Sequence, residues 1–214
     1  MFLHNREELQ NLRKEAEERL HAAKLRVLVC AGTGCIASGS KEIYDKMKEL
    51  SEGNGQVSVE FEGEVPHPEI RKSGCHGFCE MGPLMRIEPL GILYIKVKVE
   101  DCEEIYEKTI CQGQPIERLL YHKDGQVYAK QTRLVLKNCG HIDAENIEEY
   151  IAVGGYSALE KVLFDIDKDT ALDMMEESGL RGRGGGGFPA GRKWKQVARQ
   201  KETQRYVVCN GDEG

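Results

Sequence analysis

The feature that most constrains this chain is a pair of short cysteine loops, each rich in glycine. Cys30 and Cys35 enclose the residues AGTG, and Cys75 and Cys79 enclose HGF. Thiolates separated by three or four residues can bind one metal ion together if the backbone between them turns sharply. Glycines permit such turns and let amide N–H groups approach sulfur; those in the two loops are Gly32, Gly34, Gly74 and Gly77. The sequence therefore predicts that two distant loops meet around a metal centre.

Three interpretations of the four cysteines are open on the residues alone. One pair for each of two irons gives the ligand set of a [2Fe–2S] cluster. Four thiolates also suit a structural zinc ion, although zinc sites favour two residues between paired cysteines, and neither pair here has two. The third interpretation is a coincidence of unrelated buried thiols. His76 is interpreted as a surface or hydrogen-bonding residue, and the remaining thiols as ordinary ones: Cys102, Cys111, Cys139 and Cys209.

The first residues, MFLHNREELQ, show no secretory signal, so we expect a reducing compartment, in which eight cysteines indicate metal binding or catalysis. No window approaches the ~18 apolar residues of a membrane span, so we expect a cytoplasmic protein without direct membrane insertion. The composition, 40% hydrophobic and 31% charged, argues against disorder. The net charge of −6 argues against a nucleic-acid partner.

Hydrophobic periodicity predicts an α/β arrangement in about the first 110 residues. The expected order is helix, strand, helix, three strands and a closing helix around a small mixed sheet. The corresponding ranges are 9–23, 25–30, 39–50, 56–61, 84–87, 92–99 and 101–110. Asp124-Gly125 indicates a hairpin turn, and helices are expected over 142–153, 157–164 and 170–177, with a strand over 206–209.

A glycine-rich loop follows near the end of the chain. Gly182, Gly184 and Gly187 satisfy GxGxxG, but a polar helical segment precedes them, so the strand that a Rossmann fingerprint requires is missing. Eight basic residues lie between Arg181 and Arg205, against Glu202 alone. Uncrowded amides beside such a charge suit a phosphate or pyrophosphate. A flexible linker and a solvated helix face are the alternatives.

The first half of the chain resembles a known family in both cysteine loops. VCAGTGCIASGS and GCHGFCEMGPL resemble the thioredoxin-like [2Fe–2S] ferredoxin domain, which occurs in the 24 kDa subunit of complex I and fused to flavin subunits of bifurcating hydrogenases. The resemblance covers about residues 1–120. It implies that Cys30, Cys35, Cys75 and Cys79 are the cluster ligands.

The end of the chain resembles a second family. SGLRGRGGGGFPAGRKW and YVVCNGDEG are similar to the start of the FMN- and NADH-binding domain of the complex I 51 kDa subunit and its hydrogenase relatives. This resemblance implies that Gly182 and Gly184 line the flavin and that Lys193 places a charge beside it. It further implies that Phe188 stacks on NADH. The remaining implied contacts are Asn210 and Asp212 on the flavin and Glu213, the expected catalytic residue, near the nicotinamide.

Together the resemblances imply a domain organisation. We expect a thioredoxin-like ferredoxin domain over 1–120, a linker or hairpin over 121–140, and the incomplete N-terminal part of an α/β FMN/NADH-binding domain over 141–214. The expected [4Fe–4S] domain of the family would lie in a missing C-terminal part, so we interpret the chain as a fragment.

The function implied is that of an electron-transfer subunit of an NAD(P)H-oxidising flavin and iron–sulfur oxidoreductase. Electrons from NADH or NADPH would pass through FMN to iron–sulfur clusters and on to other subunits of a hydrogenase or NADH dehydrogenase. Two alternatives stay open at this point. One is a stand-alone [2Fe–2S] carrier with a non-functional flavin tail, and the other is a zinc-stabilised interaction domain with four thiolate ligands.

Overall fold

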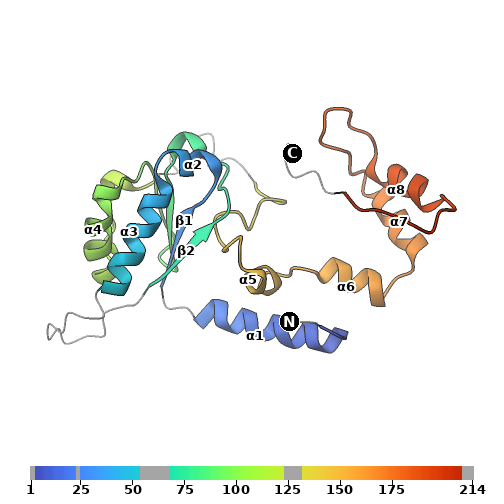
Figure 1. Ribbon diagram of the computed structural model, residues 1–214, viewed down its shortest axis with the longest axis horizontal. Helices are drawn as coiled ribbons and strands as arrows, with labels where there is room; N and C mark the ends of the chain where they lie inside the picture. Colours follow the sequence, from blue (N-terminus) through green and yellow to red (C-terminus); the bar gives the residue numbers. More distant parts are fainter. Residues whose placement is uncertain (1–2, 23–24, 54–67, 123–131, 209–214) are drawn as a thin grey trace. The chain divides into compact units, whose positions relative to one another are not determined.

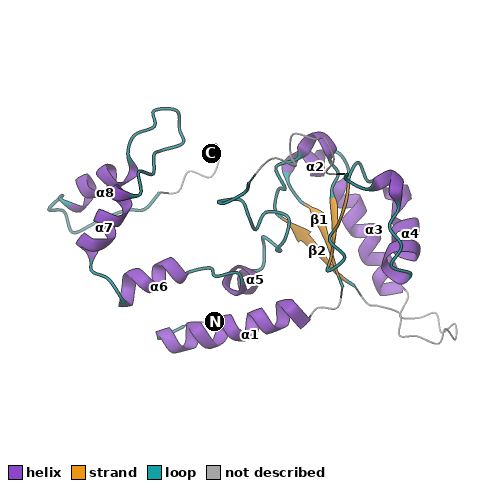
Figure 2. Ribbon diagram, turned by 180° about the vertical axis from the view of Figure 1, so that it is seen from behind, coloured by secondary structure: helices purple, strands orange, loops and turns teal. Residues whose placement is uncertain are grey.

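The computed structural model describes residues 3–22, 25–53, 68–122 and 132–208. The chain forms two compact units, Met1–Gly155 and Tyr156–Gly214 (Figures 1 and 2). The first unit includes the 1–120 range expected for the ferredoxin domain. The expected hairpin at Asp124-Gly125 and the expected strand over 56–61 lie outside the described residues.

The first unit is built on a four-stranded mixed sheet with the order β2-β1-β3-β4. Its strands are β1 (Arg26–Cys30), β2 (Glu69–Ser73), β3 (Met85–Glu88) and β4 (Ile92–Tyr94). β1 and β2 are parallel, with Cys30 opposite Ser73, whereas β1–β3 and β3–β4 are antiparallel. All five residues of β1 are buried, which explains why its sequence, RVLVC, is almost continuously apolar.

The first unit also contains several helices. They are α1 (Arg6–Ala22), α2 (Thr33–Ala37), α3 (Ser40–Gly53), α4 (Cys102–Glu104), which continues as the π-helix η3 (Ile105–Cys111), and α5 (Ile147–Ala152). Three 3₁₀ turns are η1 (Cys79–Met81), η2 (Val99–Asp101) and η4 (Glu117–Leu119). Figures 1 and 2 show α3 and α4 side by side, in agreement with their direct contact.

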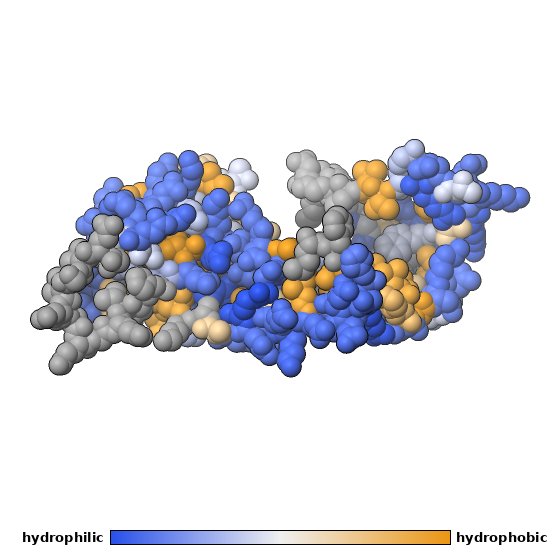
Figure 3. Space-filling view, turned by 60° about the horizontal axis from the view of Figure 1, so that its bottom comes forward, coloured by the Kyte–Doolittle hydropathy of each residue, from blue (hydrophilic) through white to orange (hydrophobic). Residues whose placement is uncertain are grey.

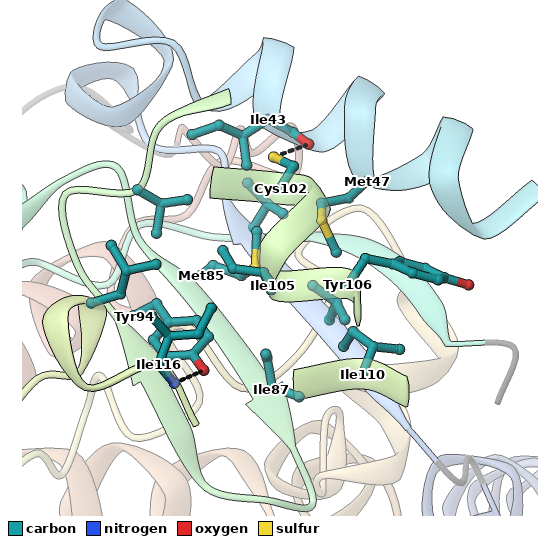
Figure 4. Packing of buried hydrophobic residues seen from close by; sticks show 14 of the residues in the cluster. Ile43, Met47, Met85, Ile87, Tyr94, Cys102, Ile105, Tyr106, Ile110 and Ile116 are labelled. Atoms are coloured by element: carbon teal, nitrogen blue, oxygen red, sulfur yellow. Dashed lines mark hydrogen bonds between the residues drawn. The ribbon is translucent and has the colours of Figure 1, made fainter. Parts of the chain in front are cut away.

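The core lies between the sheet, α3 and the α4–η3 helix. Figure 4 shows Ile43 and Met47 of α3 packed against Met85, Ile105 and their neighbours. Tyr94, whose side chain is fully buried, accepts a hydrogen bond from the Ile116 N–H at 2.9 Å and lies 2.6 Å from Thr109 Oγ1. The polar end of this tyrosine is thus satisfied inside the core.

Several expected elements are confirmed, and others differ. The helices predicted over 9–23, 39–50, 157–164 and 170–177 are present with shifts of a few residues at their ends. β2 lies outside the ranges predicted as strands, because its residues, EIRKS, include a single apolar one. The strand predicted over 206–209 is wrong for its described part, since residues 206–208 form no strand and are largely exposed.

The second unit contains α6 (Ser157–Phe164), α7 (Lys168–Glu177) and α8 (Ala190–Ala198). α7 packs against α8, and Lys195 of α8 forms ion pairs with Asp173 at 2.6 Å and Glu176 at 2.5 Å. Among the described residues of this unit, no apolar side chain is fully buried. Figure 3 shows one face of the molecule, with hydrophobic groups at the surface among hydrophilic ones.

Within the described residues, no helix has both the length and the apolar character needed to cross a membrane.

The buried thiol of Cys102 gives a first prediction, on stability at high pH. Burial raises the pKa of Cys102 to about 12. Because the folded pKa lies above the unfolded one, the neutral thiol stabilises the fold below pH ~9, and this contribution declines as the pH rises toward 12. Chemical unfolding of the wild type and Cys102→Ala at several pH values should show the wild type losing stability more steeply, by about 1.4 kcal/mol per pH unit. Parallel slopes in the two proteins would contradict this assignment.

Candidate functional site

The first cysteine pair lies at the end of the central strand. Cys30 is the last residue of β1, and Cys35 lies in α2, a short helix where the sequence predicts a loop; both side chains are buried. The Cys30 N–H donates to the Leu84 carbonyl at 3.0 Å, which ties the strand end to the segment before β3. Phe78 and Leu84 pack beside the pair. The pair is therefore shielded from water.

The second cysteine pair is exposed. Cys75 follows β2 after Gly74, and Cys79 begins the turn η1. Gly77, between them, has φ +67°, a left-handed conformation that favours glycine. Its N–H donates to Cys75 Sγ at 3.3 Å, as expected for an amide approaching a ligand sulfur.

The two loops meet because β1 and β2 are parallel neighbours whose carboxyl ends lie at the same edge of the sheet. Cys30 pairs in register with Ser73, so the residues after each strand come side by side. A Cβ on Gly32 would lie 3.1 Å from Cys75 Sγ, and one on Gly34 would lie 3.5 Å from Cys79 Sγ. The approach is tight at Gly32, where a side chain would crowd Cys75, and is an ordinary contact at Gly34.

A third glycine, Gly82, also contacts sulfur at this site, which the sequence does not predict. A Cβ on Gly82 would lie 2.8 Å from Cys35 Sγ, closer than real Cβ atoms come. The sequence signal for it is weak, since Gly82 lies three residues after the second pair and is typical of an ordinary turn before Pro83. A Cβ on Gly74, by contrast, would meet the Ala144 Cβ, and the Gly74 carbonyl accepts from Cys30 Sγ at 3.9 Å.

The electrostatics of the thiols reflect their proximity. Burial, reinforced by a hydrogen bond with Cys30, raises the pKa of Cys35 to about 12. The neighbouring Cys75 raises the pKa of Cys79 above its ordinary value. Binding a metal at these thiols must therefore displace protons.

The donor set fits two pairs of thiolates. Within the described ranges, no three His, Cys, Asp or Glu side chains are placed to hold a single metal ion. A [2Fe–2S] cluster is held by four cysteine thiolates in all. The four cysteines and the Gly77 N–H donor to Cys75 Sγ are groups of the kind that such a cluster uses.

His76 lies between the ligand candidates of the second loop but is buried, only 6% exposed. Its Nε2 lies 2.7 Å from Ser73 Oγ, which agrees with a hydrogen-bonding role. Burial lowers the pKa of His76 to about 4, so the ring is neutral near pH 7.

The described candidates for contact with flavin or NADH lie in one loop and the helix after it. The Gly182 N–H donates to the Phe188 carbonyl at 2.9 Å, closing a loop that contains Gly184. Phe188 is 46% exposed, and Lys193 lies exposed on α8. Asn210, Asp212 and Glu213 lie outside the described residues.

Comparison with known families gives two matches. Residues 18–109 match the model of the thioredoxin-like [2Fe–2S] ferredoxin, and residues 175–214 match that of the Nuo51 FMN-binding domain. Both resemblances seen in the sequence, and the thioredoxin-like fold class, are thereby confirmed.

Three relatives illustrate these matches. The NADP-reducing hydrogenase subunit HndC of Solidesulfovibrio fructosivorans is 51% identical over 85 residues, covering 40% of this chain and 17% of that protein. A subunit of the NADH-quinone oxidoreductase of Aquifex aeolicus is 44% identical over 89 residues, covering 41% of this chain and 20% of that one. A 2Fe-2S ferredoxin of Aquifex aeolicus is 34% identical over 89 residues, covering 42% of this chain and 74% of the ferredoxin. The chain thus spans a fifth or less of the length of the first two relatives.

Proposed function

The chain belongs to the thioredoxin-like [2Fe–2S] ferredoxin family, and from this premise we propose that it transfers single electrons through one cluster held by Cys30, Cys35, Cys75 and Cys79. The observation that supports this is the approach of the two cysteine loops at the carboxyl ends of two parallel strands. When bound, such a cluster supplies one-electron redox chemistry. The chain's own residues hold the thiolates, shield Cys30 and Cys35 from water, and donate the Gly77 N–H to Cys75 Sγ.

The wider proposal is an electron-transfer subunit of an NAD(P)H-oxidising flavin and iron–sulfur oxidoreductase. The match of residues 175–214 to an FMN-binding domain supports it, as do relatives named as subunits of a hydrogenase and of NADH-quinone oxidoreductase. Its partners would be other subunits of such a complex, reached by electrons from NADH or NADPH through FMN. We place this activity in the cytoplasm, where the seven free thiols that the structure describes would stay reduced.

For the flavin, we assign backbone contacts to Gly182 and Gly184 and a neighbouring charge to Lys193. The space around Gly184 supports this, because a Cβ there would meet nothing within 4 Å, whereas the Gly182 N–H already donates to the Phe188 carbonyl. A cation near the flavin favours its reduced anion. Asn210 and Asp212 are assigned to the flavin, and Glu213 to the nicotinamide, by resemblance alone.

Visible spectroscopy of anaerobically purified protein tests the cluster. We expect sulfide-to-iron charge-transfer absorption that dithionite bleaches, with iron and acid-labile sulfide in equal amounts. A colourless protein that contains stoichiometric zinc would refute the electron-transfer function.

A second prediction concerns Phe188, proposed to stack on NADH. In the assembled oxidoreductase, Phe188→Ala should raise the KM for NADH by about tenfold, since stacking of a base on an aromatic ring contributes about 1–3 kcal/mol. Flavin content should stay unchanged. Phe164→Ala is the matched control, because Phe164 is a phenylalanine outside the glycine loop. Its side chain is 56% exposed, against 46% for Phe188. Equal KM values for the two variants would exclude the stacking role.

A further inference from the structure

The segment of residues 132–146, here called the strap, lies against the second cysteine loop. An isolated β-bridge joins Asp143 of the strap to Ser73, the last residue of β2. Gly74 and Ala144 are close together: a Cβ placed on Gly74 would lie 3.4 Å from the Ala144 Cβ. The strap therefore packs along the residues that lead directly into Cys75, although the two segments are far apart in the sequence.

The strap also encloses His76, the residue after Cys75. A Cβ on Gly140 would lie 2.7 Å from both Cε1 and Nδ1 of the His76 ring, so the strap backbone contacts the ring directly. The Arg133 guanidinium donates from Nη1 to the His76 carbonyl at 2.6 Å. These contacts bury His76 although its neighbour Cys75 is exposed.

The position of His76 decides where the next amide points. The His76 carbonyl, which accepts from Arg133, belongs to the same peptide unit as the Gly77 N–H, which donates to Cys75 Sγ. Because a peptide unit is planar, fixing its carbonyl oxygen also fixes its N–H. Hydrogen bonds to cluster sulfurs contribute to the reduction potential.

The strap is fastened to the central strand at its other end. The Asp143 N–H donates to Glu149 Oε2 at 2.9 Å, and the same oxygen accepts from Arg26 Nη2 of β1 at 2.7 Å. Both side chains of this ion pair are buried, at 8% and 9% exposure. The strap is thus a fixed part of the first unit.

From these contacts we infer that Arg133 and Gly140 are positioning residues for the cluster. They hold the His76–Gly77 peptide so that its N–H stays on Cys75 Sγ, and they thereby raise the reduction potential. The direction follows from charge: reduction makes the cluster more negative, and an N–H donor stabilises that state more than the oxidised one. This inference rests on the proposed cluster.

The test is a redox titration, followed by EPR, of the cluster in the full chain. Arg133→Met removes the donor to the His76 carbonyl, and Gly140→Ala displaces the ring without changing any charge. We expect both variants to retain the cluster and to show a lower reduction potential. A tenfold shift of the one-electron equilibrium toward the oxidised cluster corresponds to a decrease of about 59 mV. Arg133→Lys, which keeps a donor, should restore part of the shift.

Lys137→Met is the matched control, because Lys137 is an exposed cation of the strap whose loss removes the same charge. It should shift the potential less than Arg133→Met does. Unchanged potentials in Arg133→Met and Gly140→Ala would overturn the inference. So would loss of the cluster from Arg133→Met with the fold intact by circular dichroism, since it would show a purely structural role. A wild-type chain without any cluster would instead refute the proposed function.

Discussion

Cys75→Ala is expected to abolish the cluster, lowering bound iron and acid-labile sulfide nearly to zero. Cys75 contributes one of the four sulfurs that the two loops bring together, and alanine supplies no metal ligand. The parallel pairing of β1 with β2 would be unaffected, so the loss should be specific to the metal site. The measurement is iron and sulfide per chain after anaerobic purification, with visible absorption as a second readout.

Cys111→Ala is the control for this experiment. Cys111, like Cys75, is an exposed free thiol of the first unit, but it lies at the end of η3. It should keep the full cluster. A cluster that persists in Cys75→Ala and disappears in Cys111→Ala would show that the ligand assignment is wrong.

Glu149→Ala should destabilise the first unit by about 3–5 kcal/mol, the largest effect expected for a residue outside the cysteine loops. It removes the partner of Arg26, whose side chain is only 8% exposed, and leaves a buried charge uncompensated. It also removes the acceptor of the Asp143 N–H. Arg26 Nε already has no hydrogen-bond partner within the described structure, so little compensation is available.

The neighbouring Glu148→Ala is a matched control for that measurement. Glu148 lies on the same helix and pairs with Arg19 at 3.0 Å, but the two side chains are 41% and 57% exposed. Pairs of this kind contribute about 0–1 kcal/mol. Denaturant unfolding of the two variants should differ by at least about 2 kcal/mol, the gap between the two ranges. Equal stabilities would contradict the structural role assigned to the Arg26–Glu149 pair.

The cysteine site is largely predictable because its signals are local. Each pair and its glycines lie within a few residues, and short spacing by itself restricts the chemistry. That Gly32 and Gly34 lie against the sulfurs of the opposite loop follows from the pairing of β1 with β2, which no short segment encodes. The four ligands and the flavin contacts themselves stay predictions until metal and flavin are measured.

Elements that depend on distant contacts are not predictable from the sequence alone. β2 has a single apolar residue, and its strand conformation depends on its parallel pairing with β1. The contact between Arg133 and His76 joins residues 57 positions apart, and that between Arg26 and Glu149 joins residues 123 apart. The link between two domains over 121–140 stays a prediction; the described residues of that range belong to the compact unit Met1–Gly155.

Native mass spectrometry of the anaerobically purified chain tests the central claim most directly. We predict a mass above that of the polypeptide by two iron and two sulfide ions, less the protons displaced from the thiols, and loss of this increment in Cys75→Ala. A chain that carries one zinc ion, or the bare polypeptide mass after purification and iron–sulfide reconstitution, would contradict the account.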